Sequence, residues 1–141
     1  MATVELLLSP LPIHVRTARL IGVAAARRAG LGAEVLDELR LAVGEACSRA
    51  VALHAAHAPG EPVQLLVRDD PTGLTVEVVD RGPESGPVVD DVEQLFGEDD
   101  IDPRVSLAVI AGLVDDVTIT PSATGTSVLL RWPLTPRAPA A

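Results

Sequence analysis

The chain has 141 residues, a length that fits one domain with one hydrophobic core, and it carries a net charge of −9 at pH 7. No apolar run reaches the roughly 18 residues that a transmembrane helix needs, and the start of the chain lacks the basic residues of a signal peptide, so we expect a cytoplasmic protein. Between residues 80 and 102 there are nine acidic residues and one arginine, whereas the rest of the chain is nearly neutral. A chain with this charge, no basic patch and almost no aromatic residues is a poor candidate for binding DNA or RNA, and we expect protein partners instead.

The first half of the chain predicts one strand, two helices and a hairpin. Residues 3–8 are typical of a strand, and residues 12–28 predict a helix that ends at Gly30. A second helix is predicted over residues 33–57. Beyond it, the apolar runs 63–68 and 74–79 predict a hairpin that turns at residues 70–73.

The second half begins with a long acidic loop over residues 81–102. Loops of this length without secondary structure are uncommon in compact domains and are more often functional lids than plain connections. A third helix is predicted over residues 103–114, with Pro103 at its first position, and two strands follow at residues 116–120 and 126–132. We expect one domain over residues 3–134 and a disordered tail over residues 135–141.

This order of elements predicts the α+β class. Helices gather early in the chain and most strands pair with neighbours in sequence, which favours a two-layer sandwich of a mixed sheet covered on one face by helices.

The second helix contains polar residues on an otherwise apolar pattern. Residues 39–51 repeat apolar side chains at the spacing of a buried stripe, and Glu45 and Arg49 lie four residues apart at the edge of that stripe. At this spacing a glutamate and an arginine form an ion pair worth about 0.2–0.5 kcal/mol on an exposed helix. We therefore expect Glu45 to be ionised and engaged by Arg49.

Three segments together resemble the anti-sigma-factor serine kinases of the GHKL ATPase superfamily, which have the Bergerat ATP-binding fold. Residues 39–51 look like the N box of that family, residues 79–82 like its first glycine box, and residues 125–128 like its last. The likeness covers about residues 3–134. Each segment is weak alone, but their order and the loop between them make the combination fairly specific.

The resemblance implies a role for each matching residue. Glu45 takes the place of the general base that acts on a serine hydroxyl of a partner protein. Asp80 takes the place of the aspartate that accepts a hydrogen bond from the adenine amino group, and Gly82 that of the glycine beside it. Gly125 and Thr126 match the pair that lines the adenine pocket. Taken singly, each also fits a plain structural role at a helix edge or a turn.

The chain departs from the family pattern where the phosphates and the metal are held. Arg49 replaces the asparagine that holds magnesium, and a guanidinium has five donors and no acceptor, so Mg²⁺ binding is not expected. Glu84 replaces a glycine of the first box, and the start of the third helix lacks the family's glycines. Acidic groups about 6 Å from a polyphosphate repel it by about 2–3 kcal/mol each before salt screening, so ATP binding is expected to be weak or lost. The alternative is that Arg49 or Arg104 binds the phosphates directly, without metal.

The remaining candidate residues indicate little chemistry. Cys47 lies within the apolar helix and is expected to be a buried small hydrophobe. His54 and His57 share a helical face, but no third metal ligand accompanies them, and solvation at the helix end is the favoured interpretation.

We expect an anti-sigma regulatory protein of a bacterial partner-switching circuit. By resemblance, its partners are an anti-anti-sigma factor and, as a second candidate, a sigma factor, and a homodimer is a candidate assembly. The acidic loop and the basic helix with Arg16, Arg19, Arg27 and Arg28 are candidate docking surfaces. The alternative is an active ATP-dependent protein serine kinase that uses Glu45 as its base. The catalytic half of a histidine kinase is disfavoured because no phosphoacceptor helix pair accompanies the domain.

Overall fold

A computed structural model of the chain describes residues 2–82 and 103–134, with side chains described from residue 107 onward in the second range. The elements in these residues are β1 (Ala2–Leu8), α1 (Ile13–Ala29), α2 (Ala33–His57), β2 (Val63–Asp70), β3 (Gly73–Asp80), α3 (Pro103–Leu113), β4 (Asp116–Ser122) and β5 (Gly125–Pro133). Every element predicted from the sequence is confirmed, with bounds that differ by two residues at most. Most of the predicted acidic loop and the predicted disordered tail lie outside the described residues.

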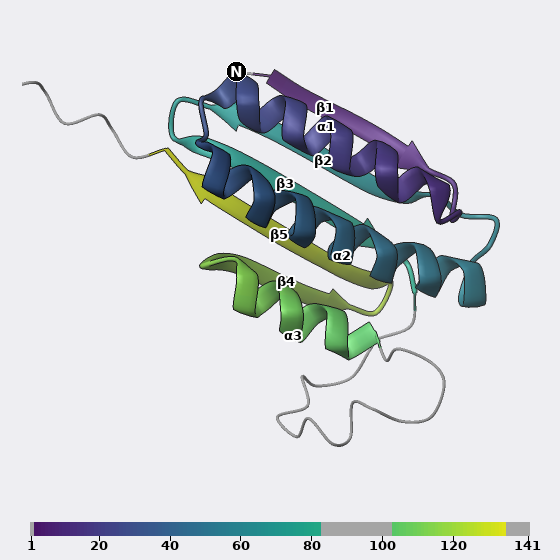
Figure 1. The fold of residues 1–141 in the computed structure, drawn as a ribbon. Helices are drawn as coiled ribbons and strands as arrows, with labels where there is room; N and C mark the ends of the chain where they lie inside the picture. Colours follow the sequence, from purple (N-terminus) through teal and green to yellow (C-terminus); the bar gives the residue numbers. More distant parts are fainter. Residues whose placement is uncertain (1, 83–102, 135–141) are drawn as a thin grey trace, which may run out of the picture.

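The strands form one sheet in the order β1-β2-β3-β5-β4. The three helices lie on the same face of this sheet, which gives the predicted α+β sandwich of two layers (Figure 1). In the described part of the chain, no helix is long and apolar enough to span a membrane.

The predicted mixed sheet is wrong in one respect, because all four strand pairings are antiparallel. Two helices connect β1 to β2, so the chain returns to the sheet running in the opposite direction. A single helix in the described residues lies between β3 and β4, and these two strands do run in the same direction. They are not neighbours, however, because β5 lies between them and is antiparallel to both.

The core lies between the sheet and the helices. Alternate residues of β3 face the helical layer and are buried, as the two-residue period of a strand requires. They meet the apolar stripe of α2, in which Leu39 and Val43 are fully buried. Burial of each such side chain contributes about 1.5–3 kcal/mol. The buried row of β3 continues to its last residue, Asp80, and a carboxylate in this position needs a partner.

Candidate functional site

The partner of Asp80 is Arg49. Nη1 of Arg49 donates a hydrogen bond to Oδ2 of Asp80 at 2.7 Å, and both side chains are 1% exposed. A charge-assisted contact at this distance is among the strongest that side chains make. The pair joins the middle of α2 to the end of β3.

The predicted pairing of Arg49 with Glu45 is therefore wrong: among the ion pairs of the described residues, Arg49 is joined to Asp80. Arg49 lies on the buried stripe of α2 itself rather than at its edge. A buried guanidinium needs a buried carboxylate, whereas Glu45 is half-exposed and retains contact with water. The expectation that Arg49 engages Glu45 thus fails.

The second oxygen of the Asp80 carboxylate is also used. Oδ1 accepts a hydrogen bond from the backbone N–H of Gly82 at 3.0 Å. A Cβ at Gly82 would lie 2.9 Å from Cβ of Leu53, so this glycine brings the backbone directly against α2. The structure therefore brings Asp80, Gly82 and Arg49 together, as the sequence suggested. Arg49 and the N–H of Gly82 each donate a hydrogen bond to the carboxylate of Asp80.

His54 forms a second link between α2 and the end of β3. Its side chain is fully buried, Nε2 accepts a hydrogen bond from the N–H of Arg81 at 2.8 Å, and Nδ1 lies 2.8 Å from the carbonyl oxygen of Glu61. Because the ring accepts at Nε2, the proton is on Nδ1, which donates to Glu61. The predicted solvation of His54 is wrong, while His57 is exposed. Within the described residues, no group of three or more acidic, histidine or cysteine side chains could hold a metal ion.

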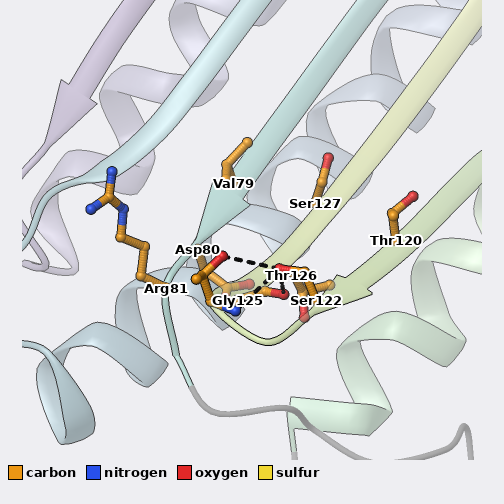
Figure 2. A pocket seen from close by; sticks show the side chains of 9 residues that line it. Val79, Asp80, Arg81, Thr120, Ser122, Gly125, Thr126 and Ser127 are labelled. Atoms are coloured by element: carbon orange, nitrogen blue, oxygen red, sulfur yellow. Dashed lines mark hydrogen bonds between the residues drawn. The ribbon is translucent and has the colours of Figure 1, made fainter.

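Gly125 and Thr126 lie on the strand beside Asp80. Thr126 is 4% exposed and pairs with Asp80 across β3 and β5 (Figure 2). Gly125 has φ +146°, and a Cβ there would collide with the carbonyl oxygen of Asp80. Here glycine permits the close approach of two protein segments.

A hollow of about 470 Å³ lies at the same end of the sheet, on its opposite face. Val79, Ser127 and Thr120 follow one another across β3, β5 and β4, and their side chains point away from the helices seen behind the sheet (Figure 2). The alternation of β3 places Val79 on this face and the carboxylate of Asp80 on the other. Neither Glu45 nor Arg49 lines this hollow.

Two further predictions concern Cys47 and Arg104. Cys47 is fully buried, so the expectation of a buried small hydrophobe is confirmed. Desolvation raises the pKa of its thiol to about 12, against an opposing effect of the Arg19 charge. Arg104 belongs to α3, but its side chain lies outside the described residues, as do the acidic residues of the predicted loop from position 84 on.

The comparisons with known proteins agree with this fold. The model of the histidine kinase-like ATPase domain family matches residues 8–132, and the chain belongs to that family. Among solved structures, the chain resembles the crystal structure of the RsbU and RsbW domains of Rv1364c from Mycobacterium tuberculosis, with a TM-score of 0.67 and 17% sequence identity. The match covers 93% of this chain and 32% of that one. No curated protein matches the chain.

Proposed function

We propose that the chain is an anti-sigma regulatory protein of a bacterial partner-switching circuit that binds an anti-anti-sigma factor, and a sigma factor as a second partner, with ATP binding weak or lost. The family match and the likeness to a structure that contains an RsbW domain support the regulatory class. The buried pair of Arg49 and Asp80 supports the loss of ATP binding.

The energies favour the protein's own arginine over a nucleotide. In the proposed site, adenine would donate one hydrogen bond to the Asp80 carboxylate, and a hydrogen bond to a charged group is worth about 1.5–3 kcal/mol. Displacement of Arg49 from this carboxylate would break a buried ion pair, which costs about 3–5 kcal/mol. The phosphates offer no compensation through magnesium at this position, because a guanidinium cannot ligate a cation.

The partner surface in this proposal is the exposed side of α1. Arg16, Arg19 and Arg27 are exposed, whereas Arg28 is engaged by Asp69 at 3.3 Å. The guanidinium of Arg19 lies against the backbone of α2 at Gly44, where any Cβ would collide with it. Because Gly44 has no Cβ, the guanidinium of Arg19 can lie directly against the backbone of α2.

An apolar groove of about 280 Å³ lies beside that cation. It is lined by Pro12, Val15, Arg19, Ser48, Val51, Ala52 and Ala55. Apolar side chains of a partner fit a groove of this size, and an acidic group beside them would meet Arg19. Such charge complementarity acts mainly on association rate and partner choice.

The competing function is an active protein serine kinase that phosphorylates the anti-anti-sigma factor. One observation favours it: the structure pairs Arg49 with Asp80, which leaves the half-exposed carboxylate of Glu45 outside that pair. In this version Glu45 accepts the proton of the partner's serine. Arg104 is then the remaining candidate for contact with the phosphates.

A phosphate-transfer assay separates the two functions. In the transfer assay, the chain is incubated with labelled ATP, Mg²⁺ and each anti-anti-sigma factor encoded in the source genome. In a separate measurement without nucleotide, surface plasmon resonance detects the complex of the chain with each of these factors. The proposal expects a complex in the absence of ATP and no transfer of label. Transfer that disappears in Glu45→Gln would establish the kinase instead.

The proposal includes a cytoplasmic location and a homodimer as the candidate assembly. Sedimentation velocity of the purified chain tests the assembly. A single species at the mass of one chain, at micromolar concentration, would remove the homodimer from the proposal.

A further inference from the structure

The backbone at Arg81 and Gly82, where the chain leaves β3, is held from inside the molecule. The N–H of Arg81 donates to His54, and the N–H of Gly82 donates to Asp80. Both accepting side chains are 1% exposed or less. The position of these two amides is therefore determined by groups that water does not reach.

Each of the two acceptors is fixed by a second hydrogen bond. The Glu61 carbonyl fixes the ring of His54, and the guanidinium of Arg49 fixes the carboxylate of Asp80. The contact to Oδ2 directs the other oxygen, Oδ1, toward Gly82. Arg49 thus acts on the backbone through Asp80.

We propose that Arg49 is a positioning residue that serves as a built-in ligand of Asp80. It supplies from within the protein the N–H donor that an adenine amino group would supply from outside, so the backbone of Arg81 and Gly82 is set before any molecule binds. This inference rests on the proposed function for the role of Asp80. It goes further, because it gives Arg49 a task in addition to the exclusion of nucleotide.

The chemistry of arginine suits this task. A guanidinium carries five N–H donors and no acceptor, so it can only donate to the carboxylate. The interaction at 2.7 Å is charge-assisted and buried, which makes it insensitive to salt. The resulting order at Gly82 does not depend on the concentration of a nucleotide.

Amide hydrogen exchange of the full chain, followed by NMR, tests the inference. The Gly82 amide is compared with core amides such as that of Val78, with and without millimolar adenosine, in the wild type, in Arg49→Asn and in Arg28→Asn. The last variant removes an exposed arginine whose partner is Asp69 and serves as the matched control. Exchange relative to the core separates positioning of Gly82 from a general loss of stability, which would accelerate all amides together.

In the wild type, we expect slow exchange at Gly82 that adenosine leaves unchanged. In Arg49→Asn, loss of the oriented acceptor should accelerate Gly82 at least about tenfold relative to the core, and adenosine should restore the slow exchange. Arg28→Asn should match the wild type. The inference is overturned if Arg49→Asn leaves the relative rate at Gly82 unchanged, if adenosine does not restore slow exchange there, or if adenosine slows exchange in the wild type.

A second variant covers the case in which Arg49→Asn does not fold. Arg49→Met combined with Asp80→Asn removes both charges together, so no uncompensated charge stays buried. Acceleration at Gly82 in this folded variant is again the expected result, and an unchanged relative rate would overturn the inference. The proposed function and the inference can fail separately. If the wild type phosphorylates its partner while Arg49→Asn shows the expected acceleration at Gly82, the proposed function alone is defeated.

Discussion

Two arginines, Arg49 of α2 and Arg19 of α1, are used in opposite ways. The side chain of Arg49 is 1% exposed and paired with Asp80, whereas Arg19 is exposed and lies against Gly44 beside an apolar groove. Among the ion pairs of the described residues, Arg19 has no carboxylate partner. The difference suggests that the buried cation serves the fold, while the exposed one remains available to a partner.

The largest effect is expected when the buried pair is broken. Arg49→Met leaves the Asp80 carboxylate buried without its cation, which should lower the free energy of unfolding by about 3–5 kcal/mol. Urea denaturation measures this change. Adding Asp80→Leu should recover most of the loss, because well-packed apolar residues often replace a buried ion pair without cost. A single variant within about 0.5 kcal/mol of the wild type, the range of an ordinary surface substitution, would show that the pair does not hold the two elements together.

The next effect concerns the strand that packs against Asp80. Gly125→Ala places a Cβ against the Asp80 carbonyl oxygen at a φ of +146°, so we expect a loss of about 1–3 kcal/mol in thermal or urea unfolding. Gly112→Ala is the matched control, because a Cβ there meets nothing within 4 Å. Equal stability of the two variants would contradict the close approach of β5 to the end of β3.

The exposed arginine should affect binding rather than stability. Arg19→Ala should change the free energy of unfolding by no more than about 0.5 kcal/mol, as is usual for surface residues. It should weaken the proposed complex with an anti-anti-sigma factor by about tenfold, the effect of an arginine near the centre of an interface. Surface plasmon resonance measures the affinity, with the exposed Arg68→Ala as control. Equal affinities for both variants would place the partner elsewhere.

The smallest effect is expected at Cys47, where the charge of Arg19 lowers the pKa of the thiol against the larger effect of burial. The thiolate is the reactive form, and burial raises the pKa of this thiol to about 12, so a disulfide reagent at pH 8 should not react with the folded chain. Reaction should begin when urea unfolds the protein. Prompt reaction in the native state would show that the helical layer near Arg19 opens more readily than its packing indicates.

The periodicity of the sequence was enough to predict the elements and their layers. The periodicity could not show that β5 lies between β3 and β4, because the order of strands depends on contacts between distant segments. For this reason the prediction of a mixed sheet is wrong. Motifs predicted the candidate site residues Asp80, Gly82, Gly125 and Thr126, and the structure brings these residues together with Arg49.

The partner of Arg49 could not be predicted in the same way. Local spacing favoured Glu45, four residues away, whereas the actual partner lies 31 residues away in sequence. Burial decided between the two carboxylates, and burial becomes known only when the layers are packed. His54 was missed as an anchor for the same reason, although it lies four and three residues after Ala50 and Val51 of the apolar stripe, a spacing that was a usable signal.

We propose that the chain's own arginine occupies the carboxylate that a nucleotide would need. Isothermal titration calorimetry of ATP with Mg²⁺ into the wild type and into Arg49→Asn tests it most directly. We predict no measurable binding heat for the wild type and saturable binding for the variant. Micromolar binding to the wild type that Arg49→Asn does not improve would contradict the account.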